Sequence, residues 1–251
     1  MNLRQQLITI FFLFNGCIAI EFGEYFKNCY LNSPEFDSCI VESLNAIRPY
    51  FKTGLPKYNV APFDPFYAKE VSVRRGLPNA GFKLTLKNIT ESGWTASKVT
   101  KFYSDLGNYK ITYTQKFPKK KLVGGYDFSG SFLGSTINNK GKFTLTLYDL
   151  VQTTTITSVP KKAMDVKVNV QSIKDLELHI SNLLQGRNFL EEVLDRIING
   201  AWQPGFAVIR PLINELVSTA FTEIFGKAFK NFPFQEIIKS KPFFKLNSTK
   251  V

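Results

Sequence analysis

The chain has 251 residues, of which 44% are hydrophobic and 21% are charged, and its formal net charge is +12 at pH 7. This length allows a substantial core in one large domain or two small ones. No apolar run is long enough for a transmembrane helix, which excludes membrane-spanning helices from the predicted structure. Most of the positive excess is scattered lysine, which favours a solvated surface over a binding site for nucleic acid, anionic lipid or glycans.

The first residues have the features of a secretory signal. Arg4 supplies a positive charge, Leu7–Phe14 an apolar core, and Cys17-Ile18-Ala19 a small-residue cleavage site. The pattern predicts secretion, with residues 1–19 as the signal peptide and a mature chain over residues 20–251. The alternative is a short buried helix.

Cleavage after Ala19 discards Cys17 and leaves Cys29 and Cys39. Two cysteines in an oxidising compartment most simply form one disulfide, worth about 3 kcal/mol on the loop-entropy model. The triplets at Asn88 and Asn247 match the acceptor pattern for N-linked carbohydrate, so we expect glycosylation at both.

The first predicted element of the mature chain is a helix over Glu35–Lys52. Its apolar residues recur at helical spacing, and Gly54 is placed to end it. A proline-rich connector follows from Pro56 to Pro65, and we expect it to be extended.

Alternation of apolar and polar residues then predicts five strands, over residues 82–87, 109–117, 126–132, 143–151 and 164–170. Turn residues separate them at Gly107-Asn108, Pro118–Lys121, Asn138–Gly141 and Val159–Lys162. Such short connections predict an antiparallel meander with one buried face.

The helical pattern returns after Gly186. From Val208 to Phe232 two apolar residues alternate with two polar or small ones, so the apolar stripe drifts by about 40° per repeat. We expect a break or kink between Gln203 and Pro211, then a long helix contacted from several sides. A twisted sheet beside such a helix would wrap around it. The predicted fold is α+β, with a long C-terminal helix wrapped by a curved antiparallel sheet, a shorter N-terminal helix, and an apolar interior that packs solid or leaves a tunnel.

Sequence signatures of catalysis are missing. His179 is the only histidine, it lies near the end of an expected strand, and no Gly-x-Ser-x-Gly elbow accompanies it. The chain has no HExxH, paired Cys-x-x-Cys, P-loop or dinucleotide fingerprint. We therefore predict a protein that is not an enzyme and has no cofactor and no metal site.

Apolar side chains on the strands and the last helix are candidate ligand contacts. Tyr109, Tyr113 and Tyr126 combine an apolar ring with a hydroxyl that can orient a ligand's polar group. The other candidates either line a tunnel or pack as core: Phe82, Leu84, Phe128, Phe132, Phe143, Leu145, Val166, Val168, Leu212, Leu216, Phe221 and Phe225.

Two lysine clusters, Lys119-Lys120-Lys121 and Lys161-Lys162, fall in expected turns with one turn between them. Because successive turns of a meander alternate ends, the clusters are expected at the same end of the sheet. There they form either a patch for anionic membranes or solvated hairpin tips.

In its motifs the chain resembles an insect family, the takeout proteins and the related haemolymph juvenile-hormone-binding proteins. The resemblance covers nearly the whole mature chain and rests on these residues in order: Cys29 and Cys39, Gly54-Leu55-Pro56, Asp64-Pro65, Tyr126 with Gly130, Gly141, Asn199-Gly200-Ala201-Trp202 and Phe232-Pro233-Phe234. A second cysteine pair is absent, which leans toward the takeout proteins and away from the hormone carriers proper.

The resemblance implies a single domain of tubular lipid-binding type over residues 20–251, with an internal tunnel for a long apolar ligand. The sequence thus favours a secreted, monomeric carrier of a terpenoid, fatty acid or similar lipid, with no nucleic acid partner. The alternative is a basic secreted protein that binds anionic lipid surfaces in host defence.

Overall fold

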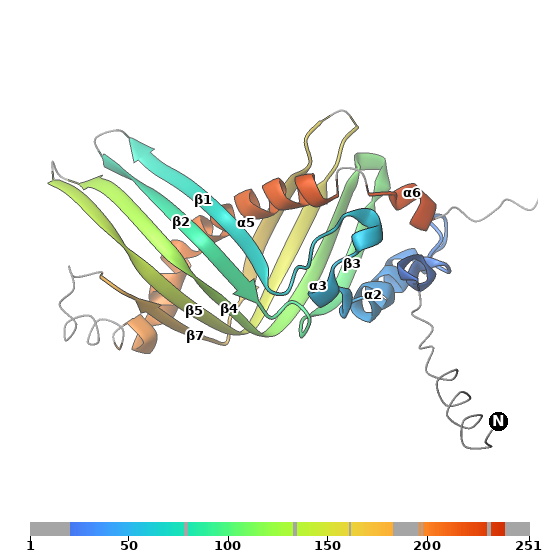
Figure 1. Ribbon diagram of the computed structural model, residues 1–251, viewed down its shortest axis with the longest axis horizontal. Coiled ribbons are helices and arrows are strands. Elements are labelled where there is room, and N and C mark those ends of the chain that lie inside the picture. Colours follow the sequence, from blue (N-terminus) through green and yellow to red (C-terminus); the bar gives the residue numbers. More distant parts are fainter. Residues whose placement is uncertain are drawn as a thin grey trace, which may run out of the picture.

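The computed structural model describes residues 21–77, 80–132, 135–160, 162–182, 196, 198–229 and 232–238. The expected signal peptide and Asn247 therefore lie outside the described residues, as does most of the segment between Gly186 and Trp202. Figure 1 shows a curled antiparallel sheet with a long helix along it and a group of short helices at one end.

The elements follow one another in this order: η1 (Phe22–Phe26), α2 (Phe36–Ala46), α3 (Tyr50–Thr53), η2 (Pro56–Tyr58), β1 (Phe66–Leu77), β2 (Ala80–Ser92), β3 (Lys98–Asp105), η3 (Leu106–Asn108), β4 (Lys110–Phe132), β5 (Ser135–Thr157), β6 (Asp165–Ser172), β7 (Asp175–Ile180), α5 (Trp202–Ala228) and α6 (Phe234–Ile237). The predicted architecture of a long C-terminal helix packed by a curled antiparallel sheet is confirmed.

Strands β4 and β5 form the centre of the sheet. Each of them pairs with one outer strand along its first half and with a different outer strand along its second half. The first half of β4 pairs with β3 and its second half with β2, whereas β5 pairs first with β7 and then with β6. Two strands of 23 residues accumulate a large right-handed twist, and this twist curls the sheet.

The predicted turns at Pro118–Lys121 and Asn138–Gly141 are wrong, since both segments lie inside these long strands. Pro118 is tolerated because it sits where β4 passes from β3, paired up to Lys116, to β2, paired from Lys121. No outer neighbour needs its missing N–H there. Gly141 serves close packing, because a Cβ at this position would collide with the carbonyl oxygen of Ser181.

Helix α5 is continuous from Trp202 to Ala228, so the chain does not break between Gln203 and Pro211, and a kink there stays a prediction. Pro204 falls in the first turn, where the helix needs no donor, and Pro211 is accommodated inside the helix. The helix packs against β6 on one side and β1 on the other. It therefore joins the two edges of the curled sheet.

The polar residues of the four-residue repeat fasten α5 to the edge strand β6. The side chains of Asn214, Ser218 and Thr222 accept hydrogen bonds from the backbone N–H groups of Val170, Val168 and Val166 at 3.0, 2.8 and 3.0 Å. Glu215, the neighbour of Asn214 in the helix, pairs with Arg75 of β1.

The predicted N-terminal helix is divided in two. Pro49 is the N-cap of α3, and Gly54 ends α3 with a φ of +69°, a conformation that favours glycine. Cys29 and Cys39 form a disulfide with 5.4 Å between their Cα atoms, which ties η1 to α2. Asn88 is exposed on β2, where its side-chain oxygen accepts a hydrogen bond from Tyr67. Its glycosylation stays a prediction.

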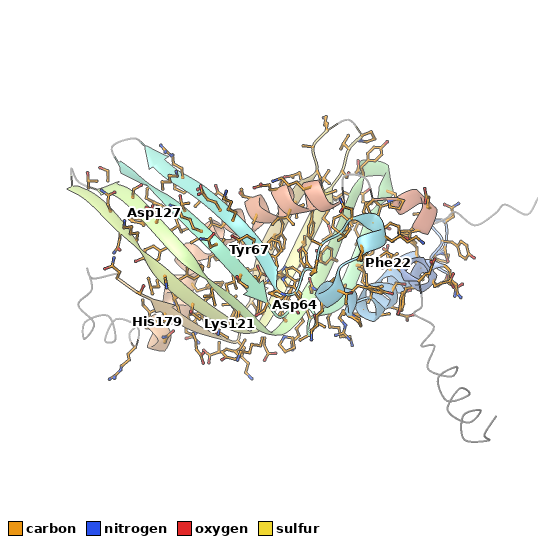
Figure 2. The ribbon with its side chains drawn as sticks, in the orientation of Figure 1. Phe22, Asp64, Tyr67, Lys121, Asp127 and His179 are labelled. Atoms are coloured by element: carbon orange, nitrogen blue, oxygen red, sulfur yellow. A yellow bond between two sulfur atoms is a disulfide. The ribbon has the colours of Figure 1, made fainter. Side chains whose placement is uncertain are left out.

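The two lysine clusters do not lie at the same end of the sheet, so the prediction that they form one basic patch there is wrong. Lys119, Lys120 and Lys121 lie within β4 because this strand does not turn at Pro118, and Lys121 lies near the middle of the molecule (Figure 2). Lys120 is buried. Lys162 is exposed in the turn between β5 and β6, and Lys161 lies outside the described residues. Within the described part of the chain, no helix is long and apolar enough to cross a membrane.

Asp64 fixes the turn after β2, because its carboxylate accepts the backbone N–H groups of Gly93 and Thr95 at 3.1 and 2.8 Å. Burial raises the pKa of Asp64, but the hydrogen bonds from Thr95 and Gly93 outweigh it and hold the pKa below its ordinary value. This turn contains Trp94, an aromatic residue buried in the core.

Replacing Asp64 with asparagine should lower the free energy of unfolding by about 1–2 kcal/mol near neutral pH, because an amide offers only one acceptor. A carboxyl with a lowered folded pKa stabilises above its unfolded pKa, and this contribution is lost as the pH falls through the folded pKa. The difference between wild type and variant in urea unfolding should therefore shrink on acidification. An equal difference at neutral and acidic pH would contradict this account.

Candidate functional site

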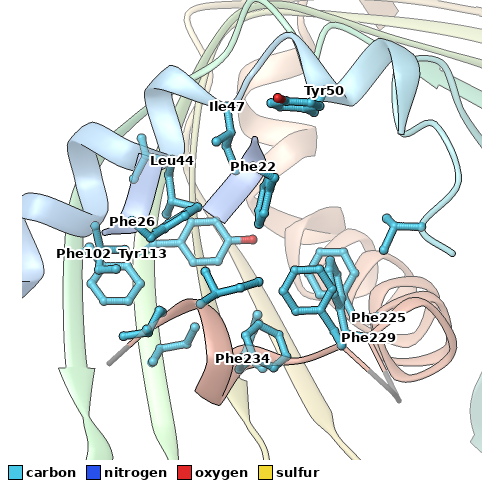
Figure 3. Close-up of a pocket in the computed structure, with 18 of the residues that line it drawn as sticks. Phe22, Phe26, Leu44, Ile47, Tyr50, Phe102, Tyr113, Phe225, Phe229 and Phe234 are labelled. Carbon is cyan, nitrogen blue, oxygen red and sulfur yellow. The ribbon is translucent and has the colours of Figure 1, made fainter. Parts of the chain in front are cut away.

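A cavity of about 520 Å³ lies at one end of the molecule, between the N-terminal helices, the end of α5 with α6, and the half of the sheet that contains β3. Figure 3 shows its walls, which are almost entirely apolar. The N-terminal helices supply Phe22, Phe26, Phe36, Ile40, Leu44 and Ile47, and the C-terminal helices supply Phe225, Phe229, Phe234 and Ile237.

Phenylalanine rings close the cavity between the two ends of the chain. Phe225 and Phe229 lie one turn apart on α5 with 5.6 Å between ring centroids, and Phe229 continues to Phe232 at 5.4 Å. Phe232 in turn meets Phe22 of η1 at 5.9 Å. These edge-on contacts hold the N-terminal segment against the end of α5.

Three exposed apolar side chains mark the opening of the cavity. Leu106 and Tyr109 belong to the β3–β4 connection, and Phe234 begins α6. All three line the cavity and are nevertheless exposed to solvent.

Tyr113 places a hydroxyl inside the apolar cavity. Its ring projects from β4, and Figure 3 shows the hydroxyl directed into the space bounded by Phe22, Phe26 and Phe225. Burial raises the pKa of Tyr113 to about 12. The group is therefore a neutral hydrogen-bond donor across the physiological pH range.

Trp94 forms the inner wall of the cavity. Its ring lies 5.1 Å from Phe117 and 5.5 Å from Phe221, measured between centroids, and both of these residues are almost completely buried. The Lys120 Nζ atom lies 4.3 Å from the centroid of the Trp94 ring. Solid core therefore begins behind Trp94.

Of the candidate ligand contacts predicted from the sequence, Tyr109, Tyr113 and Phe225 line this cavity. Tyr126 instead donates a hydrogen bond to Asn139 or to the backbone carbonyl of Ser181. Several other candidates belong to the main hydrophobic core: Leu84, Leu145, Val166, Val168, Leu212, Leu216 and Phe221.

The remaining candidates lie on the half of the sheet that contains β2 and β7. Phe82 and Phe128 stack on each other with 5.7 Å between centroids, and Phe143 is buried on β5. The side chain of Phe132 lies outside the described residues. The sequence prediction missed the residues of η1, α2 and α6 that form most of the cavity wall. The dense aromatic composition of residues 22–36 was the only sign of them.

The histidine and the acidic side chains of the described residues are not grouped into a metal site. His179 is exposed on β7, and no cluster of three or more His, Cys, Asp or Glu side chains within the described ranges is placed to hold a metal ion. The geometry instead offers a partly open apolar cavity with few polar groups on its wall.

Known proteins share this fold and sequence pattern. The chain is 26% identical over 230 residues to the circadian clock-controlled protein daywake of Drosophila yakuba, a match that covers 86% of this chain and 87% of that protein. The daywake protein of Drosophila melanogaster matches to the same extent. The crystal structure of Takeout 1 from Epiphyas postvittana superposes with a TM-score of 0.57 at 19% identity, covering 82% of this chain and 97% of that one, and thus shows the same fold.

The family model described as haemolymph juvenile hormone binding protein (JHBP) matches residues 8–239, which is nearly the entire chain. That description names a binding protein and not an enzyme, in agreement with the prediction from the sequence. The chain therefore belongs to the haemolymph juvenile hormone binding protein family, to which the takeout proteins are related.

Proposed function

We propose that the protein is a secreted carrier that sequesters a small hydrophobic molecule in the cavity beside the N-terminal helices. The observation that carries this proposal is the partly open apolar cavity of about 520 Å³, within the size range of small-molecule sites. Removing ligand surface from water at about 25 cal/mol per Å² supplies the affinity, and no chemical step is needed.

The ligand class is a terpenoid, a fatty acid or a similar lipid with one polar group. The description of the family as juvenile hormone binding supports a small hydrophobic ligand, and the neutral hydroxyl of Tyr113 offers one hydrogen bond inside an otherwise apolar space. The Cys29–Cys39 disulfide supports an oxidising, extracellular location. Mass spectrometry of an organic extract of the natively secreted protein tests the proposal directly, since it should release a stoichiometric lipid.

Replacing Leu44 with tryptophan should weaken uptake of an apolar fluorescent probe, because Leu44 lines the cavity from α2 and the larger ring would occupy part of the space. Burial of the indole in existing space should leave thermal stability unchanged or slightly raised. The matched control is Val41→Trp on the same helix, since Val41 does not line this cavity. Equal probe binding by wild type and Leu44→Trp would rule out the cavity as the binding site.

A further inference from the structure

The side-chain amide of Gln115 is an unusual group to find on the cavity wall. Gln115 projects from β4 next to Tyr113 on the same face, lines the cavity and is only 3% exposed. Buried polar atoms are nearly always hydrogen-bonded, because leaving one unpaired is costly. Each polar atom of this amide therefore needs a partner.

The hydrogen bonds around Ser97 fix the orientation of the amide. The Ser97 hydroxyl donates its one hydrogen to the backbone carbonyl of Trp94 at 2.5 Å. It therefore acts as an acceptor toward Gln115, whose Nε2 atom donates to it at 2.6 Å. The Oε1 atom of Gln115 is buried and has no hydrogen-bond partner among the described residues.

Two donors on the same wall complement this acceptor. The indole Nε1 of Trp94 is buried and has no acceptor within the described ranges, and Trp94 lines the cavity. Ser97 connects the backbone carbonyl of Trp94 to the amide of Gln115 through the two bonds above, so the two residues belong to one side of the cavity. The Tyr113 hydroxyl points into the same space (Figure 3).

We propose that Gln115, Trp94 and Tyr113 form a head-group subsite for a ligand whose polar end both donates and accepts a hydrogen bond, namely a hydroxyl or an un-ionised carboxyl. Such a head donates to Oε1 of Gln115 and accepts from the indole or the phenol. An ether or ester only accepts, so it leaves Oε1 unpaired, and an alkane offers neither interaction. The inference rests on the proposed carrier function and narrows its ligand class.

Displacement of a bound apolar fluorescent probe from the full-length mature protein by dodecanol, dodecyl methyl ether and dodecane tests the subsite. Dodecanol should bind about ten-fold more tightly than the ether, because only the alcohol can satisfy Oε1. Equal affinities for the alcohol and the ether would overturn the subsite and leave the carrier function standing. Failure of all three to displace the probe would overturn the carrier function as well.

Replacing Gln115 with methionine should bring the affinities for dodecanol and the ether within about two-fold of each other while dodecane binding is retained. The matched control is Gln152→Met. Gln152 lies directly opposite Gln115 across β4 and β5, is 2% exposed and has an unpartnered Nε2 atom, but it does not line the cavity.

The control separates two explanations of the unpaired amide. If the two glutamines bond to each other in solution, the wild type should show no head-group preference and both substitutions should change stability alike, which would overturn the subsite. Loss of preference in Gln115→Met alone supports it. The comparison of dodecanol with dodecyl methyl ether on the wild-type protein tests the subsite even where a variant does not fold.

Discussion

Replacing Lys120 with methionine should lower the free energy of unfolding by about 3–5 kcal/mol, because it leaves a carboxylate buried without its partner. The Lys120 Nζ atom lies 2.5 Å from Oε1 of Glu91, and the two side chains are only 4% and 6% exposed. The ammonium also lies over the rings of Phe117 and Trp94, at 4.1 and 4.3 Å from their centroids. Burial lowers the pKa of Lys120, and Glu91 opposes that shift.

Chemical denaturation of three variants separates the charge effect from loss of packing. The double variant Lys120→Met with Glu91→Leu should recover most of the stability, since well-packed apolar residues often replace a buried ion pair at little cost. Lys87→Met is the control. The pair of Lys87 with Asp127 is 46% and 48% exposed, so its loss should cost less than about 1 kcal/mol. Equal losses for Lys120→Met and the double variant would show that packing alone, and not charge, explains the effect.

The run of Pro118 and three lysines shows what local sequence reasoning misses. Proline followed by consecutive charges is typical of a turn, and the sequence prediction treated this run as one. In the structure β4 continues, because Glu91 on the neighbouring strand neutralises the single inward-facing lysine while Lys119 and Lys121 face solvent. The local sequence around Pro118 does not indicate that Glu91 of β2 lies beside Lys120 in the folded sheet.

The fold was largely predictable because it depends on periodicity. Alternation placed the residues of β2, β4, β5 and β6 on strands, and the four-residue repeat placed α5. The cavity was not predictable in the same way. Its wall combines η1, α2, η3 and α6, which are distant in sequence, and an alternating strand looks the same whether its inner face meets a ligand or solid core. The expected tunnel along the helix stays a prediction, whereas the described cavity lies beside the N-terminal helices and has Trp94 in its wall.

Replacing Ser218 with valine should lower the free energy of unfolding by about 1–3 kcal/mol, because it leaves the buried N–H of Val168 without an acceptor. The Ser218 hydroxyl accepts that N–H at 2.8 Å and donates to the backbone carbonyl of Asn214 at 2.5 Å. Amide hydrogen exchange at Val168 should accelerate more than exchange in β2, since the opening is local to the edge strand.

Thr219→Val is the matched control, because Thr219 is the adjacent polar residue of the repeat and is exposed. It should change stability by no more than about 0.5 kcal/mol. Similar losses for both variants would mean that valine disturbs the helix itself and that the contact with β6 contributes nothing. A combined change of Asn214, Ser218 and Thr222 should release β6 from α5, with faster exchange at Val166, Val168 and Val170 together.

The geometry of a helix packed beside a strand explains the four-residue repeat, and the Ser218 prediction tests this explanation. Four residues of an α-helix rise about 6 Å, and two residues of a strand rise about 6.6 Å. A side chain at every fourth helical position therefore stays level with every second residue of an adjacent strand. Asn214, Ser218 and Thr222 meet Val170, Val168 and Val166 in this register, with the helix and strand running in opposite directions. The stripe on the helix drifts by about 40° per repeat, and the twist of the sheet turns the edge strand along with it. A period of four therefore keeps the helix in contact with the curled edge of the sheet, whereas a straight amphipathic stripe would move away from that edge.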